Sequence, residues 1–188
     1  MLRKRSNQFE DWVQQGFAEI RRTTGTWLVW INPPVVPIGM RGKMPIFAMT
    51  GSSLFDLGGW TSAARAEKAF VGVELKETRQ FHPSLPIIRR DRKGSGLQHH
   101  QIEALAGLHR DGHIAGLLWS NSGIVGWCDG EVLAAAYYEF EVSLAAEDMG
   151  KAPKKGARSI SWQKFSPVMG DQPEDWYKEK VHHELVRN

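Results

Sequence analysis

The hydrophobic residues in the first third of the chain change from a helical to a strand spacing. Residues 6–22 carry an apolar side chain at about every third or fourth position, which predicts an amphipathic helix. Residues 26–31, Thr-Trp-Leu-Val-Trp-Ile, are rich in β-branched and aromatic side chains and predict a strand. The prolines and glycines of residues 33–44 predict an extended excursion from the core.

The strongest strand pattern covers residues 69–76, Ala-Phe-Val-Gly-Val-Glu-Leu-Lys. The other elements that the pattern predicts are short strands over 45–50 and 54–60, a helix over 97–110, strands over 113–120 and 124–127, a helix over 132–147, a strand over 158–165 and a helix over 175–186. This order predicts an α/β fold in which a mixed central sheet is flanked by helices.

Length and composition narrow the class of protein. A chain of 188 residues, 41% hydrophobic and 24% charged, is long enough for one domain, which we expect to span residues 1–188. The only cysteine is Cys128, which excludes an internal disulfide framework and predicts a reducing, cytoplasmic compartment. We find no apolar window of membrane-spanning length, so no membrane partner is expected.

The basic residues are clustered, although the net charge is only +3. The clusters are Arg3, Lys4 and Arg5; Arg89, Arg90, Arg92 and Lys93; and Lys151, Lys154, Lys155, Arg158 and Lys164. Any one cluster is explained by a solvated loop. Three such clusters in one small chain favour a surface that binds a phosphate backbone.

The chemistry begins with the pair Glu74 and Lys76 in the strongest strand. Side chains alternate along a strand, so both point to one face while Val73 and Leu75 point to the other. A salt bridge at a sheet edge would explain the pair. The functional alternative is metal-dependent phosphodiester cleavage, in which Glu74 and the Leu75 carbonyl bind a divalent ion and Lys76 orients or activates the attacking water.

This chemistry needs a second carboxylate, and Asp56 is the best placed. It lies in a short strand pattern, and a hairpin through the polar segment 61–68 would set it beside Glu74. Mg²⁺ is the expected ion because it prefers oxygen ligands and retains water. The alternative is that Asp56 is only a turn residue.

Two further residues are candidates for the same site. Glu10 falls at the edge of the apolar face of the first helix and could supply a third acid, or be a solvated rim residue. Gln101 opens the helix over 97–110 and could point back to Glu74 and Lys76. The tryptophans Trp27, Trp30 and Trp119 lie in strand patterns, and we expect them in the core rather than as base-stacking platforms.

Taken together, three segments resemble a known family. Asp56, the string Glu-Leu-Lys-Glu-Thr at 74–78 and the string His-Gln-Ile-Glu at 100–103 are similar to the RecU-type Holliday junction resolvases of Gram-positive bacteria and their phages. These enzymes belong to the PD-(D/E)xK nuclease superfamily. The resemblance covers residues 9–127, with a weaker echo over 159–174, so residues 150–188 form a divergent C-terminal region and residues 1–6 a basic arm.

The resemblance implies a restriction-endonuclease-like core and a role for each matching residue. Asp56 and Glu74 would bind the metal, Lys76 would be the catalytic lysine, and Gln101 and Glu10 would be auxiliary. Residues 33–44 would form a short stalk that enters the junction. The residues expected to face DNA are Arg41 and Lys43 on this stalk and Arg89, Arg90, Arg92 and Lys93 on a loop.

The resemblance also implies a reaction and a partner. Family members are homodimers that nick two opposed strands of a four-way junction symmetrically, in recombination and repair, with Mg²⁺ or Mn²⁺. Two alternatives stay open at this point. One is a nuclease of the same superfamily that acts on flaps, ends or duplex DNA, and the other is a non-catalytic junction-binding protein.

Overall fold

The computed structural model describes residues 8–31, 35–41, 44–49, 53–61, 69–89, 94–152, 156 and 158–182, with side chains outside 35–49. The elements in chain order are α1 Gln8–Gln15, α2 Phe17–Thr24, β1 Trp27–Trp30, β2 Val35–Arg41, β3 Met44–Met49, β4 Leu57–Trp60, β5 Phe70–Thr78, β6 Ser84–Ile88, β7 Leu97–Gln98, α3 His99–Arg110, β8 Ile114–Asn121, β9 Ile124–Asp129, α4 Gly130–Asp148, β10 Ser159–Ser161, the 3₁₀-helix η1 Trp162–Lys164, β11 Ser166–Pro167 and the π-helical η2 Tyr177–His182. The molecule is thus mixed α/β.

The central sheet has six strands in the order β1-β4-β5-β8-β9-β11. The neighbours β5 and β8 run parallel, with Glu74 opposite Leu117, and the other pairs are antiparallel. The sheet is therefore mixed, as the order of elements predicted. The parallel pair requires a crossover, which here contains β6, β7 and α3.

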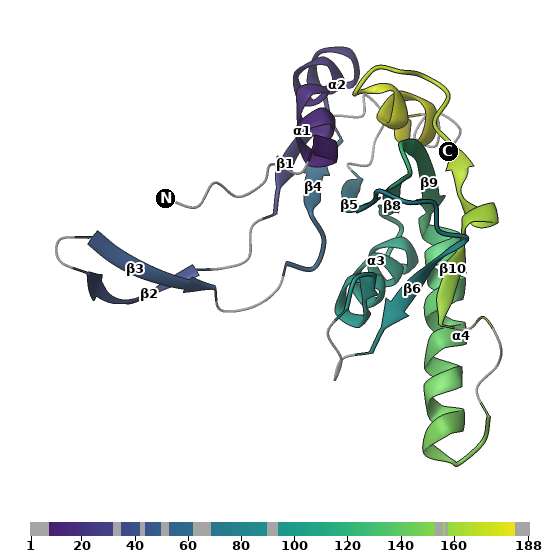
Figure 1. The fold of residues 1–188 in the computed structure, drawn as a ribbon. Helices are drawn as coiled ribbons and strands as arrows, with labels where there is room; N and C mark the ends of the chain where they lie inside the picture. Colours follow the sequence, from purple (N-terminus) through teal and green to yellow (C-terminus); the bar gives the residue numbers. More distant parts are fainter. Residues whose placement is uncertain are drawn as a thin grey trace.

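Helices cover both faces of this sheet (Figure 1). On one face, Val71, Val73 and Leu75 of β5 belong to a buried cluster that includes residues of α1, α2 and the C-terminal helix. On the other face, Ala115, Leu117 and Trp119 of β8 pack with residues of α3, α4 and the small sheet β10-β6-β7. Strand β5 is covered on both faces, so a charged side chain in its middle is shielded from water. Glu74 occupies such a position, which is unusual for a carboxyl group.

The predicted first helix is two helices, which corrects the sequence expectation. The run of α-helical hydrogen bonds is interrupted at Gly16, between α1 and α2, where the Gly16 N–H donates to the Val13 carbonyl at 3.1 Å. A Cβ at Gly16 would lie 2.6 Å from the carbonyl oxygen of Pro173, so glycine allows the C-terminal segment to approach the backbone closely. Periodicity alone continued across the break because Phe9, Val13 and Ile20 still point to the same core.

The expected excursion is longer and more regular than residues 33–44. Strands β2 and β3 pair antiparallel from Val35 opposite Met49 to Arg41 opposite Met44, and form a two-stranded sheet of their own. Figure 1 shows this hairpin extending away from the helices and the main sheet. The strand predicted over 45–50 is therefore the second arm of the protrusion rather than part of the core.

The later elements follow the prediction with several differences. Residues 158–165, predicted as one strand, contain the strand β10 and the 3₁₀-helix η1, and β6 and β11 were not predicted. Strand β7 replaces the first two residues of the helix predicted over 97–110, and the C-terminal helix is π-helical over Tyr177–His182. Strand β6 contains Pro86, which strand interiors avoid, so the sequence Ser-Leu-Pro-Ile-Ile did not predict a strand although Leu85 and Ile87 are buried. Among the helices of the described residues, none is long and apolar enough to cross a lipid bilayer.

Candidate active site

The site lies on the α3 side of the central sheet, where β4 begins. The hairpin predicted between Asp56 and Glu74 is present, since β4 pairs antiparallel with β5 from Leu57 opposite Val73 to Trp60 opposite Phe70. Asp56 comes directly before β4 and is held at three points. Its N–H donates to the Val73 carbonyl at 3.1 Å, its carbonyl accepts from Ile31 at 2.8 Å, and its Oδ2 accepts from the Leu75 N–H at 2.9 Å.

The backbone of Leu75 also faces Asp56. In an extended strand, the N–H and the carbonyl of one residue point to the same side. The Leu75 N–H bonds Asp56, so its carbonyl is directed to the same edge of β5, beyond the start of β4. The side chain of Leu75 lies in the core on the other face. The predicted oxygen ligand is therefore on the side of β5 where Asp56 lies.

Glu74 is a buried carboxyl group, with none of its surface exposed. Its Oε1 accepts from the Gln101 amide at 2.6 Å and from the Lys76 ammonium at 2.5 Å. Its Oε2 is buried, and no donor among the described residues reaches it. Leaving a carboxylate oxygen in this state costs free energy, because water that would have solvated the oxygen is lost without replacement.

The surroundings of Glu74 raise its pKa from the ordinary value of 4.5 to about 8. Burial is the largest cause, because it disfavours the charged form. The ammonium of Lys76 opposes the shift, while the neighbouring Asp56 carboxyl adds to it through its charge and a hydrogen bond. The structure thus places the carboxyl groups of Asp56 and Glu74 close together, with the single ammonium group of Lys76 beside them.

Gln101 links the helix α3 to the two charged residues of β5. Its Nε2 donates to Glu74, and its Oε1 accepts from Lys76 at 3.3 Å and from the Gln98 backbone N–H at 3.0 Å. The expectation that Gln101 points back to the sheet is confirmed. Because the side chain is only 8% exposed, these contacts fix which way the amide faces.

Gln98 is the member of this arrangement that the sequence interpretation missed. It precedes α3 as its N-cap, and its N–H bonds the side chain of Gln101 three residues later. A signal for this was present, since a glutamine or glutamate at the third helical position is the second half of a capping box. Cap geometry therefore also orients a residue of the site.

The other predicted residues are on other elements or outside the described residues. Glu10 is half-buried on α1, whose Phe9 and Val13 pack on the opposite face of the sheet. Arg89 follows β6 and pairs with Glu147 of α4 at 3.1 Å. Arg41 ends β2. The candidates that fall outside the described residues are Lys43, Arg90, Arg92 and Lys93.

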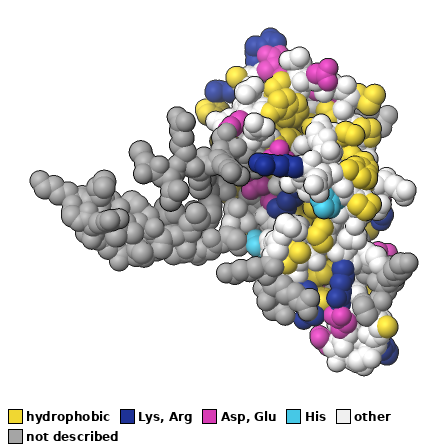
Figure 2. Space-filling model, viewed as in Figure 1, with side chains coloured by type: hydrophobic (Ala, Val, Ile, Leu, Met, Phe, Trp, Pro, Cys, Tyr) yellow, Lys and Arg dark blue, Asp and Glu magenta, His cyan; other side chains and the backbone are white. Residues whose placement is uncertain are grey.

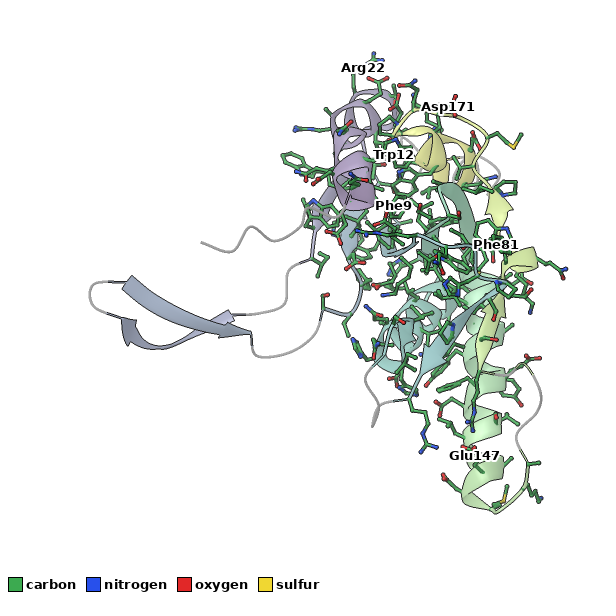
Figure 3. The ribbon with its side chains drawn as sticks, in the orientation of Figure 1. Phe9, Trp12, Arg22, Phe81, Glu147 and Asp171 are labelled. Atoms are coloured by element: carbon green, nitrogen blue, oxygen red, sulfur yellow. The ribbon has the colours of Figure 1, made fainter. Side chains whose placement is uncertain are left out.

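Charged side chains gather in several places on the face drawn in Figure 2. Basic and acidic side chains lie side by side at its top, where Figure 3 labels Arg22, near its middle, and toward the lower end, where Figure 3 labels Glu147 on α4. Among the described residues no group of three acidic, histidine or cysteine side chains is arranged as a complete metal centre. The oxygen donors available at the site are two carboxylates and one carbonyl.

Comparison with known proteins does not extend this picture. Neither the protein-family models nor the curated proteins give a match to the chain.

Proposed function

We propose that the protein is a metal-dependent endodeoxyribonuclease with a restriction-endonuclease-like core that acts on branched DNA. The observation that carries the proposal is the buried Glu74 carboxyl, which has one oxygen without a donor, beside the Asp56 carboxyl and the Lys76 ammonium. A pair of acids this close is costly for a structural role. It is the arrangement that a bound cation would relieve.

The donors fit a hard divalent cation. Carboxylate and carbonyl oxygens suit Mg²⁺, with Mn²⁺ as a substitute, and a set of few protein ligands leaves positions for water and phosphate. Asp56, Glu74 and the Leu75 carbonyl would hold the ion, and Glu74 would bind it in its ionised form. When bound, the ion would supply Lewis-acid stabilisation of charge on the phosphate and lower the pKa of a water ligand.

The protein's own residues have distinct parts in the proposed hydrolysis. Water adds to phosphorus, the bond from phosphorus to the 3′ oxygen breaks, and the 3′ oxygen leaves with a proton, so the product carries a 5′-phosphate. Lys76 places a positive charge next to the reacting phosphate and orients the attacking water. Gln101 holds both Lys76 and Glu74, and so limits how far the ammonium can move away from the site.

The protrusion and the basic segments support a preference for branched DNA. The β2–β3 hairpin extends away from the sheet, and its strand β2 ends at Arg41, two residues before Lys43 in the sequence. The basic segment 89–93 leads directly into β7 and α3, which carry Gln98 and Gln101. Two such sites in a cytoplasmic homodimer would cut two opposed strands of a four-way junction, as recombination and repair require.

The test is an end-labelled immobile four-way junction incubated with the protein in Mg²⁺, in Mn²⁺ and in EDTA. Paired symmetric nicks that require the metal and disappear in Glu74→Gln are expected, while this variant still binds the junction. The isosteric change removes the charge and keeps the shape, so folding is preserved. Glu131→Gln, an exposed glutamate on α4, is the matched control and is expected to cut like wild type.

The same experiment separates the other functions. Cutting of flaps, ends or linear duplex in preference to the junction would retain the nuclease and reject the resolvase. Tight junction binding without cutting in either metal would reject the nuclease. Full activity of Glu74→Gln would reject the assigned site.

A further inference from the structure

Two tryptophans on the edge of the central sheet are exposed, contrary to the sequence expectation for Trp27. Trp27 on β1 and Trp60 on β4 are direct cross-strand partners, and their surfaces are 56% and 54% exposed. We refer to them as the indole pair. Val29, two residues from Trp27 on the same face, is also exposed. Trp119 lies in the core, as expected, and Trp30 is half-buried.

The indole pair has a rigid backing. Trp60 meets Phe70 of β5 edge-to-face with ring centroids 5.2 Å apart, and it meets His113 in the same way at 6.1 Å. A Cβ at Gly58, between Trp60 and the start of β4, would lie within 3 Å of the side chains of Phe70 and Ile31. The layer below is therefore closely packed. An aromatic ring held in this way loses little conformational entropy when a ligand stacks on it.

Positive charge lies over one face of the Trp27 ring. The guanidinium carbon of Arg21 is 3.8 Å from the centroid of the Trp27 ring, in a cation–π contact. Arg21 is on α2 and is itself exposed. A flat aromatic surface with an adjacent guanidinium complements a nucleotide, which has an aromatic base and an anionic phosphate.

The indole pair shares a sheet face with the candidate active site. Trp60 is opposite Phe70 of β5. Every second residue of a strand points to the same face, so Phe70 shares its face with Gly72, Glu74 and Lys76. Phe70 precedes Glu74 by four residues, which corresponds to about 13 Å along the strand. A strand of DNA that reaches Glu74 needs only a few nucleotides to reach Trp60.

We propose that the indole pair is a stacking site for unpaired bases of single-stranded DNA, such as those at an opened branch point. The area available favours bases over a second copy of the chain. Two half-exposed indoles and a valine offer roughly 300 Å², whereas a stable protein interface needs about 800 Å² on each partner. The proposal extends the proposed nuclease by naming the part of its substrate that is not base-paired, and in that respect it rests on the nuclease function.

The test compares two strands of equal length and charge, oligothymidylate and an abasic oligonucleotide, in EDTA so that no cleavage intervenes. Binding is followed by intrinsic tryptophan fluorescence and by anisotropy of labelled strands. Wild-type protein is expected to bind oligothymidylate about tenfold or more tightly than the abasic strand, with quenching of its emission. In Trp27→Leu and Trp60→Leu this preference is expected to fall to about twofold or less, with affinity for the abasic strand unchanged.

Two matched variants control for folding and for the loss of any exposed ring. Tyr138→Leu removes an exposed aromatic side chain on α4 and is expected to keep the preference. Trp60→Phe keeps a ring and the contact with Phe70, and is expected to retain most of the preference even if Trp60→Leu fails to fold.

Equal wild-type affinity for the two strands would overturn the proposal. A change from dimer to monomer in Trp27→Leu, measured by sedimentation with the base preference intact, would assign the face to a second copy instead and also overturn it. The outcome is independent of cleavage. A base preference in a protein that cuts no junction would keep the stacking site and reject only the nuclease.

Discussion

Two charged clusters of the molecule are built on opposite plans. The buried cluster, Asp56, Glu74, Lys76 and Gln101, has two acids and one base, and the Glu74 side chain is 1% exposed. The arginine cluster has one acid, Glu147, which contacts Arg89 at 3.1 Å and also Arg158, with a side chain 28% exposed. The first cluster has more acids than bases around a carboxyl group that is shielded from water, and the second has more bases than acids and lies closer to water.

The difference shows how burial separates a chemical site from a surface. The side chains of Arg89, Glu147 and Arg158 are partly exposed, although Nε and Nη2 of Arg158 are buried, so water screens part of their charge and their pairing contributes little. At Glu74 the loss of hydration raises the pKa to about 8 and leaves Oε2 without a donor among the described residues. Under the proposed function, a cation would offset the close approach of the Asp56 and Glu74 carboxyl groups, and we expect the arginine cluster to face a phosphate backbone.

The largest expected effect is on cleavage. Asp56→Asn is expected to lower the rate of junction cutting by about 10³-fold or more, because an amide supplies weaker charge stabilisation for a divalent ion. Junction affinity in EDTA is expected to stay within about twofold of wild type. Initial rates under single-turnover conditions measure the change. Glu147→Gln removes an acid from the arginine cluster and is the control. A comparable fall in its cleavage rate would mean that the two clusters do not differ in their part in cleavage.

The next effect is on stability and has a defined pH window. The folded state holds a proton on Glu74 up to about pH 8, whereas the unfolded chain loses it near pH 4.5, so the folded state loses stability as the pH rises through this range. Glu74→Gln removes this dependence. Between pH 5 and 8 in EDTA, the free energy of unfolding of the variant is therefore expected to rise relative to wild type by about 2–4 kcal/mol.

Urea denaturation at several pH values measures this stability difference. Glu131→Gln is the control for removal of one glutamate and is expected to follow wild type across the range. A difference in the free energy of unfolding between Glu74→Gln and wild type that stays constant from pH 5 to 8 would mean that Glu74 ionises in the folded protein as it does in the unfolded chain. The electrostatic difference between the two clusters would then be rejected.

A smaller effect is expected for Gln101→Leu. The change keeps the size of the side chain but removes the bonds to Glu74, Lys76 and the Gln98 N–H. Cutting is expected to fall by about 10- to 100-fold through loss of positioning. Stability is expected to fall by about 1 kcal/mol through loss of the cap. If Gln101→Glu cuts at the wild-type rate, the bond from Lys76 to the residue at 101 is sufficient for positioning. An unchanged rate in Gln101→Leu would show that the amide is dispensable.

The smallest effect concerns the arginine cluster. Arg89→Gln is expected to reduce the slope of log affinity against log salt concentration by about 1, with little change in cleavage by bound protein. Arg22→Gln is the control, because Arg22 is an exposed arginine on α2 already paired with Glu19 at 2.6 Å. Fluorescence anisotropy over a salt series gives the slopes, and equal slopes in Arg89→Gln and wild type would remove Arg89 from the DNA surface.

Much of the fold was predictable because its signals are local. Strand β5 and helices α3 and α4 have strong periodicity, and their positions were predicted to within two residues or so. The break at Gly16 and the extent of the β2–β3 hairpin were not, because each depends on a contact or pairing with residues distant from the expected element boundary. The Glu74 and Lys76 pair was predictable from alternation, and Asp56 from the expected hairpin.

Tertiary structure decided the properties that turn these residues into a candidate site. Residue types and spacing determined that an acid and a lysine share a face of a central strand, since alternation is a property of the extended backbone. Only packing decided that Glu74 is buried, that its pKa is raised and that Gln101 donates a hydrogen bond to it. Packing also decided that Trp27 is exposed while Trp119 is buried. Burial depends on which distant segments of the chain cover each residue, and the local sequence pattern does not determine which segments these are.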